Sequence, residues 1–218
     1  MKKHLSLILL LLLSLTSCSD DEPSDTAYLY DIVKLESDSQ SGSVFTLCKP
    51  GSDKIITLTA RQRVDTRKVP VGNRLLLMYV PASGAEAYQS CEVTAKGYGT
   101  IVNGDLTMVE GSEIEGWDNG AVYLLSAWRA GNYLNIHCRL PYQQPPRSLS
   151  LMMPEIQADA TYPDVYLVDD ADIDVATFER AYYASFDITT LIEDTDVKGF
   201  TLHLNNSNLN LDAIRFDK

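Results

Sequence analysis

Short apolar runs separated by polar turns dominate residues 27–218 and predict β-strands. Alternation of apolar and polar side chains is typical of a strand with one buried face. Two turns stand out in the first half, Lys49-Pro50-Gly51-Ser52-Asp53 and Asn103-Gly104-Asp105, and each predicts a hairpin. The strands expected here are residues 27–36, 44–48, 54–60, 74–80, 88–96, 98–102 and 106–109. Several short strands with a bend at Gly97 and Gly99 predict a small barrel of the OB type.

The second half has the same character, with turn residues at regular spacing. Its expected strands are residues 117–129, 133–140, 149–153, 162–168, 183–188, 200–204 and 209–216, with a helical turn at 177–182. In the strand at 133–140 every second residue from Leu134 to Leu140 is apolar, which predicts one buried face. This spacing favours a β-sandwich. Residues 110–116, rich in Gly, Ser and Glu, predict the boundary between a barrel domain at 27–112 and a sandwich domain at 113–218.

The first 17 residues have the parts of an export signal: Lys2 and Lys3, an apolar run, and small residues before Cys18. The run is shorter than the roughly 20 apolar residues that a membrane-spanning helix needs. Leu15-Thr16-Ser17-Cys18 resembles a bacterial lipobox, which implies cleavage before Cys18 and acylation of that cysteine. The alternative is an ordinary secretory signal followed by an incidental cysteine. We expect a chain tethered to the membrane by lipid.

Residues 18–26 form an acidic tether. Ser19-Asp20-Asp21-Glu22 resembles the surface-export signal of Bacteroidota lipoproteins, which implies an outer-membrane protein at the cell surface. The alternative is a solvated tether on a protein that faces the periplasm. Asp25-Thr26-Ala27 is similar to the O-glycosylation site of the same bacteria, with Thr26 as the acceptor.

The charge balance argues against nucleic acid as a partner. The chain carries a net charge of −12, and removal of residues 1–17 changes it to −14 because Lys2 and Lys3 are lost. Binding to nucleic acid depends on neutralising phosphates with Lys and Arg. The basic cluster of Arg61, Arg63, Arg67 and Lys68 has two interpretations, a contact to phosphate or lipid headgroups and a solvated loop paired with nearby carboxylates.

Three cysteines remain after Cys18, in a compartment that permits disulfides. Two arrangements stay open: a Cys48–Cys91 bridge with Cys138 buried and free, and three packed thiols.

No catalytic or cofactor-binding motif is present in the sequence. Nucleophilic hydrolysis needs Ser or Cys beside His, and the only histidines after residue 17 are His137 and His203. We therefore expect no enzyme activity, no zinc and no cofactor. Carboxylates on Asp169, Asp170, Asp172 and Asp174 have a spacing that calcium could use, although the Gly and distal Glu of an EF-hand loop are missing. The other interpretation of this acidic segment is a solvated loop.

Aromatic side chains in the second half suggest either a sugar-stacking surface or ordinary core and cross-strand pairs. They are Trp117, Tyr123, Trp128, Tyr133, Tyr142, Tyr182 and Tyr183.

Three stretches together resemble the NigD-like lipoproteins: residues 71–77 (VGNRLLL), 128–136 (WRAGNYLNI) and 181–188 (AYYASFDI). The resemblance spans essentially the whole mature chain and implies an OB-like domain followed by a β-sandwich. The family name comes from a bacteriocin-associated gene cluster, and the resemblance implies an immunity or surface-assembly role without catalytic residues. We expect a non-catalytic envelope module that binds another protein. Glycan capture and envelope hydrolysis are the alternatives.

Overall fold

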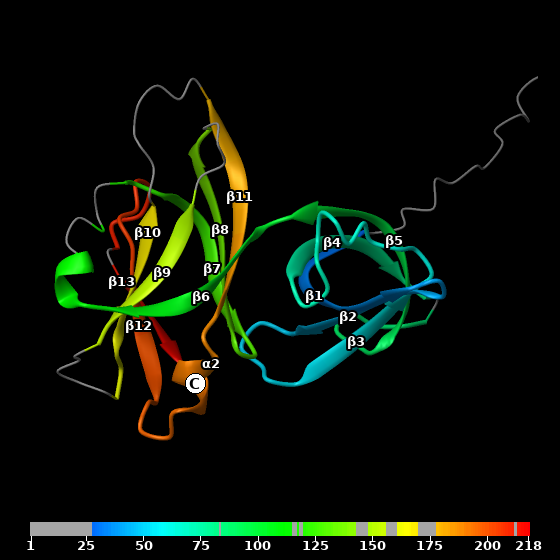
Figure 1. The fold of residues 1–218 in the computed structure, drawn as a ribbon, viewed down its shortest axis with the longest axis horizontal. Coiled ribbons are helices and arrows are strands. Elements are labelled where there is room, and N and C mark those ends of the chain that lie inside the picture. Colours follow the sequence, from blue (N-terminus) through cyan, green and yellow to red (C-terminus); the bar gives the residue numbers. More distant parts are fainter. Residues whose placement is uncertain are drawn as a thin grey trace, which may run out of the picture.

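The structure is a computed structural model that describes residues 28–82, 84–114, 117, 120–142, 148–155, 161–169, 178–211 and 213–218. Two strand assemblies lie side by side in it, a closed barrel and a larger curved sheet (Figure 1). The predicted all-β class is confirmed.

The N-terminal assembly is a closed five-stranded barrel with the order β1-β2-β3-β5-β4. Antiparallel pairing of β1 with β4 closes it, and β3 runs parallel to β5. Its strands are β1 Leu29–Ser39, β2 Gly42–Cys48, β3 Ile55–Ala60, β4 Arg74–Pro81 and β5 Cys91–Thr100. The predicted OB-like barrel is confirmed, including the β2–β3 hairpin.

Alternation builds the barrel core. In β4, Leu75, Leu77 and Tyr79 point inward and are buried, while Leu76 and Met78 face outward. Burial of each large apolar side chain contributes about 1.5–3 kcal/mol. Arg74 opens the same strand, is also buried, and lies where the barrel meets the second assembly.

The C-terminal assembly is an eight-stranded sheet with the order β13-β12-β10-β9-β6-β11-β8-β7. The first half of β6 pairs with β11, and its second half pairs with β9. Strand β6 therefore passes from one layer of the predicted sandwich to the other (Figure 1). The strands are β6 Val102–Val109, β7 Tyr123–Ala130, β8 Tyr133–Pro141, β9 Leu149–Pro154, β10 Asp164–Asp169, β11 Glu179–Asp187, β12 Gly199–His203 and β13 Ala213–Asp217.

The core of this domain lies between the two layers. Leu134, Ile136, Cys138 and Leu140 of β8 are fully buried there, as their alternation predicts. In the described part of the chain, the short helical segments η1 Gly111–Ile114 and α2 Thr189–Glu193 accompany the strands.

The loop between β12 and β13 brings the two ends of the sheet together. The Val122 amide donates to the Asn205 carbonyl, and the Ser207 amide donates to the Val122 carbonyl. The side chain of Asn208 bonds both backbone groups of Leu124 at 2.8 and 2.9 Å. These contacts cover the start of the edge strand β7 and nearly close the sheet.

Two local predictions are wrong. Asn103-Gly104-Asp105 lies inside β6 and is no hairpin turn, because the Asn103 side chain bonds the backbone N–H and C=O of Arg74 and Phe186 packs over Gly104. Strand β6 pairs with β11 and β9, so the last strand of the barrel is β5 and the second sheet includes β6. The helical turn expected at 177–182 is also wrong from Glu179 onward, where the chain is already strand β11.

Candidate binding site between the two domains

Two hairpin loops hold the domains together. The β2–β3 loop of the barrel meets the β7–β8 loop of the sheet, where the Gly51 amide donates to the Arg129 carbonyl at 2.8 Å. The Gly131 amide returns a bond of 2.9 Å to the Ser52 carbonyl. Arg129 adds an ion pair to Asp53 at 2.5 Å. The junction therefore combines backbone and side-chain bonds, which fixes how the loops meet.

Arg74 makes a second connection through its side chain. Its guanidinium crosses from β4 to the sheet, where NH1 donates to Asn135 Oδ1 at 2.9 Å and to Ser185 Oγ at 2.6 Å. NH2 donates to the Ile32 carbonyl within the barrel at 2.9 Å. The Tyr133 ring lies 4.0 Å from the guanidinium carbon, in cation–π contact. One arginine therefore contacts β1 of the barrel and both β8 and β11 of the sheet.

The charge of Arg74 is buried without a carboxylate in contact. The residue is 4 % exposed, and it forms no ion pair among the described residues. Burial lowers the pKa of Arg74 to about 10, a change that nearby Tyr133, Cys48 and Asp187 partly oppose. The arginine stays protonated at neutral pH, so a positive charge lies within the junction.

Two buried donors at this junction have no acceptor among the residues that the structure describes. They are Arg74 Nε and Asn135 Nδ2. Asn135 is fully buried, and its Oδ1 already accepts bonds from both Arg74 and Ser185. Buried donors without a partner are rare in native proteins, and each one calls for an explanation.

Three cavities surround Arg74, with volumes of about 350, 310 and 170 Å³. The largest opens between the barrel and the β7–β8 loop, beside Lys34, Glu36 and Asp53. The second lies along Asn103 and Asp187. All three include Arg74 in their walls.

The smallest of the three, here called the aromatic cavity, differs in its lining. Four aromatic side chains border it together with Arg74 and Asn135, so the two unpartnered donors belong to residues of its wall. The aromatic residues are Tyr30, Tyr88, Trp128 and Tyr183. Trp128 and Tyr183 lie on the outer face of the sheet, and Tyr30 lies on β1 of the barrel.

One carboxyl group also borders the aromatic cavity. Asp31 Oδ2 accepts a bond of 2.8 Å from the Tyr79 hydroxyl. Burial raises the pKa of Asp31, and hydrogen bonds from Tyr79 and Tyr88 partly offset that rise. Cys48 reaches the same cavity, and burial raises the pKa of its thiol.

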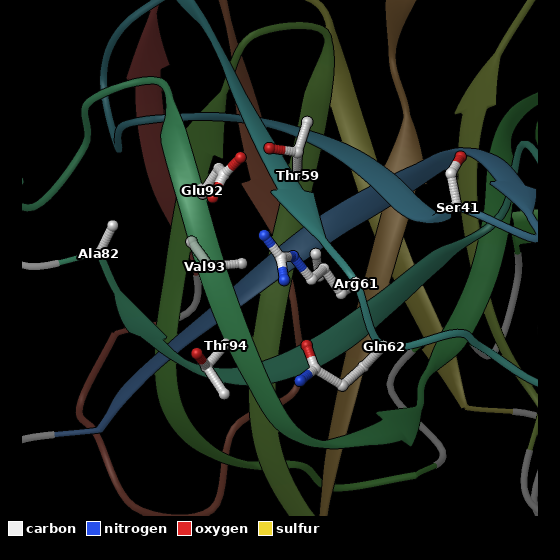
Figure 2. Close-up of a pocket in the computed structure, with 9 residues that line it drawn as sticks. Ser41, Thr59, Arg61, Gln62, Ala82, Glu92, Val93 and Thr94 are labelled. Atoms are coloured by element: carbon white, nitrogen blue, oxygen red, sulfur yellow. The ribbon is translucent and has the colours of Figure 1, made fainter.

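A separate pocket of about 420 Å³ lies on the barrel, where β3 and β5 run parallel. Figure 2 shows the Arg61 guanidinium between the two strands, near Thr59 and Val93. The Gln62 side chain accepts a bond from the Ala95 amide at 3.2 Å. The pocket is polar, and neither buried donor noted above lies in its wall.

The basic cluster divides into paired and unpaired members. Arg63 donates to Asp38 through Nε and NH2, and Arg67 forms a similar pair with Asp65. These contacts match the carboxylate-paired interpretation for two of the four residues. Arg61 and Lys68 form no ion pair among the described residues.

Ser126 lies opposite His137 across β7 and β8, but no hydrogen bond joins either histidine ring to a Ser or Cys side chain in the described part of the chain. His137 stacks on Tyr183 with ring centroids 4.0 Å apart, and burial and then Arg139 lower its pKa. His203 Nε2 lies 2.8 Å from Asp164 Oδ1 and stacks on Tyr166. Neither ring has a Ser or Cys hydrogen-bond partner in those ranges, so a catalytic triad is not assembled there.

The seven aromatic residues singled out in the sequence do not form one row. Trp128, Tyr133 and Tyr183 lie at the domain junction, whereas Trp117 packs edge-on against Tyr166. The remaining three are spread over the sheet: Tyr123 beneath Arg139, Tyr142 stacked on Phe178, and Tyr182 against the core.

None of the three cysteines after Cys18 forms a disulfide within the described residues. Cys138 lies in the core of the sheet, far from the barrel. Cys48 pairs with Ile55 and Cys91 pairs with Leu58, on opposite sides of β3. The three-residue offset along β3 corresponds to about 10 Å, which is too far for a disulfide.

Several predicted sites lie outside the described residues. These are Cys18, the export signal Ser19, Asp20, Asp21 and Glu22, the glycosylation candidate Thr26, and the calcium candidates Asp170, Asp172 and Asp174. Asp169, the described member of the acidic segment, is buried at the end of β10. Within the described ranges, no group of three or more His, Cys, Asp or Glu side chains is placed to hold a metal. None of the helices found there is long and apolar enough to cross a membrane.

Sequence reasoning missed the residues that matter most here. Arg74 looks like the polar start of an apolar strand, and Asn135 looks like a solvated position on a polar face. Both are buried because the outer face of β8 and β11 packs on the barrel. The only signal was that both lie in the stretches that resemble the NigD-like family.

Comparison with protein-family models and with curated proteins finds no match to this chain. Solved structures do match over most of its length. A DUF1344 protein of unknown function from Bacteroides vulgatus has a TM-score of 0.70 and 16% identity, covering 88% of this chain and 91% of its own. A protein from Bacteroides fragilis named "Putative lipoprotein" has a TM-score of 0.59 and 11% identity, with 88% and 96% covered.

A NigD-like immunity protein from Bacteroides caccae also matches, with a TM-score of 0.57 and 12% identity over 86% of this chain and 91% of its own. At such identities the likeness concerns the fold. It covers both assemblies, so the order of barrel and sheet is shared and not only one domain. The resemblance seen in the sequence is confirmed at this level: the chain has the two-domain fold of the NigD-like immunity protein.

Proposed function

We propose that this protein is a non-catalytic binding protein of the bacterial envelope, and that it engages a protein partner through the cleft between its two domains. The observation that carries this proposal is the convergence of three cavities on Arg74, a buried cation that contacts no carboxylate of the described residues. Clefts between domains are preferred places for ligands.

The absence of an assembled nucleophile, base and orienting group in the described ranges favours binding over catalysis. The similar structures point the same way, since they include an immunity protein, a lipoprotein candidate and proteins of unknown function. By analogy with the NigD-like immunity protein, protection against a bacteriocin is the role we favour, and surface assembly is the other role consistent with an anchored binding module.

The location we propose is the outer membrane, with lipid at Cys18 as the anchor and the acidic tether 18–26 directing the domains to the cell surface. Each buried CH₂ of an acyl chain contributes about 0.8 kcal/mol, so two or three chains make a lasting anchor. The similarity to a protein named "Putative lipoprotein" supports this location.

Chemical crosslinking in intact cells, followed by purification and mass spectrometry, tests the proposal. Tyr30 is 59 % exposed and borders the aromatic cavity, whereas Tyr28 is 51 % exposed and borders none of the cavities described here. Tyr30→Ala and Tyr28→Ala are therefore a matched pair. We expect one partner protein with the wild type and with Tyr28→Ala, and at least fivefold less of it with Tyr30→Ala.

A Cys18→Ala variant serves as the unanchored control, and we expect it to recover no partner. Equal recovery with Tyr30→Ala and Tyr28→Ala would contradict binding through the cleft. Recovery of only lipid and abundant porins would contradict a specific protein partner.

A further inference from the structure

We infer that the aromatic cavity receives a carboxylate group that stands beside an aromatic or apolar group of the partner, with Arg74 and Asn135 as its donors. This inference rests on the proposed binding function and specifies the chemistry recognised at that site.

Two unpartnered donors indicate which kind of group binds in the aromatic cavity. Arg74 Nε and Asn135 Nδ2 are both buried N–H groups without an acceptor among the described residues. The other polar atoms of the two side chains are engaged, by Ser185, by the Ile32 carbonyl and by each other. Two donors without an acceptor, on two residues that both border this cavity, match a group with two acceptor oxygens, and a carboxylate is such a group.

The positive charge of Arg74 favours an anionic acceptor over a neutral one. A buried cation is costly unless an anion or several hydrogen bonds compensate it. Arg74 has hydrogen bonds but no contacting carboxylate within the described ranges, where Asp187 acts on it only at longer range. An incoming carboxylate would supply the missing charge, through the charge-assisted geometry that arginine favours.

Among the described residues of the cavity wall, Asp31 is the acidic group, and its charge opposes an anion. Its carboxyl group accepts a hydrogen bond from the Tyr79 hydroxyl, and burial raises its pKa. Asp31 bonds Tyr79 within the barrel, whereas Arg74 bonds Asn135 across the junction between the barrel and β8 of the sheet. We therefore assign binding of the carboxylate to the donors of Arg74 and Asn135.

The aromatic walls specify what accompanies the carboxylate. Tyr30, Tyr88, Trp128 and Tyr183 border the cavity, and His137 stacks on Tyr183 at 4.0 Å. Aromatic side chains favour contact with flat or apolar groups. The volume of about 170 Å³ is below the roughly 300–1,000 Å³ of a site for a whole drug-sized ligand. The cavity therefore suits a single side group or chain end of a protein partner.

Fluorescence of Trp128 in the full mature chain tests the inference. The sequence contains two tryptophans, so a Trp117→Phe background leaves Trp128 as the sole reporter. The probes are N-acetylphenylalanine and its uncharged amide, which differ at the carboxylate alone. We expect a saturable change with the acid and at least tenfold weaker binding of the amide.

A third probe, N-acetyl-aspartyl-phenylalanine amide, carries its carboxylate on a side chain. It distinguishes recognition of a chain terminus from recognition of an acidic side chain. Stronger binding of the first acid supports recognition of a chain terminus, and stronger binding of this probe supports an acidic side chain. Both outcomes support a carboxylate site.

Variants locate the binding and guard against unfolding. Asn135→Asp keeps the size of the side chain, removes the Nδ2 donors and places a carboxylate against Arg74, so we expect loss of acid binding in a folded protein. Tyr30→Ala should weaken the acid at least fivefold, and Tyr28→Ala should leave it unchanged.

Equal binding of acid and amide, or a flat titration with both acids, would overturn the inference. If the titration is flat but crosslinking still depends on Tyr30, the proposed partner binding is supported and only the carboxylate site is contradicted. If the acid binds but no partner is crosslinked, the protein partner is contradicted and the carboxylate site is supported.

Discussion

At the scale of single residues, burial of the Arg74 charge costs free energy, and several hydrogen bonds offset that cost. Lowering of the Arg74 pKa to about 10 corresponds to a net cost of burying the charge on the order of 3 kcal/mol. Hydrogen bonds from a charged group contribute about 1.5–3 kcal/mol each, and three of them reach Asn135, Ser185 and Ile32. The arginine therefore stabilises the junction as long as its acceptors are in place.

Removal of this side chain should be costly. We expect Arg74→Ala to lower the free energy of unfolding by about 2–4 kcal/mol, because it opens a cavity and removes the donor that holds Asn135 and Ser185. Urea denaturation measures the change. Arg67→Ala is the control, since its side chain is 89 % exposed, and we expect a change within about 0.5 kcal/mol. Equal effects would mean that Arg74 is not structural.

Asp31 should give the protein a pH dependence with a defined sign. A carboxyl whose pKa is raised in the folded state binds more protons folded than unfolded, so its contribution to stability decreases as the pH rises above about 3.8. Asp31→Asn removes this titration and leaves an oxygen to accept from Tyr79. We expect the variant to gain stability relative to wild type between acidic and neutral pH in thermal unfolding. A difference that is constant with pH would contradict the burial of this carboxyl.

The polar face of β8 shows how far residue patterns predict a site. Alternation correctly separated Leu134 and Ile136 from Asn135 and His137. It could not show that the polar face meets another domain, because the bond from Arg74 to Asn135 spans 61 positions. Alternation of apolar and polar residues along one strand does not report a contact with a residue so distant in the sequence.

At the scale of elements, apolar runs predicted most strands, and turn chemistry failed once. Asn-Gly-Asp ordinarily favours a tight hairpin. In β6 the same residues serve tertiary packing, since a Cβ on Gly104 would lie 2.9 Å from Phe186 Cδ1. A glycine required by a neighbouring ring looks the same in sequence as one required by a turn.

Two glycine substitutions distinguish these explanations. We expect Gly104→Ala to lower the free energy of unfolding by about 1–3 kcal/mol, because Phe186 must move to admit the methyl group. Gly99→Ala in β5 is the matched control, as no atom lies within 4 Å of its added Cβ. Thermal unfolding compares the two. Equal stability of the variants would contradict the packing of Phe186 on Gly104.

At the scale of the whole molecule, the two domains are joined by their loops as well as by Arg74. The loop contacts reach from Gly51 and Ser52 to Arg129 and Gly131. Composition and spacing predicted two β domains but not this contact. Such a junction holds the walls of the cleft in a fixed relation.

Loss of the Asp53 carboxylate should loosen this junction locally. Asp53→Ala leaves Arg129, which is 7 % exposed, without its ion-pair partner. We expect faster amide hydrogen exchange at Gly51 and Gly131, whose bonds cross between the loops, and unchanged exchange at Leu77 in the barrel core. NMR measures both in one sample. Uniform acceleration at all three amides would indicate global destabilisation and contradict a local clamp.

The central claim is that the cleft beside Arg74 binds a partner in the envelope. Its most direct test is a photo-crosslinking amino acid placed in living cells at Tyr30 in β1 or at Tyr28 just before that strand, two positions of similar exposure. The account predicts one discrete crosslinked protein from position 30 and none from position 28. The same products from both positions, or no product from position 30, would contradict it.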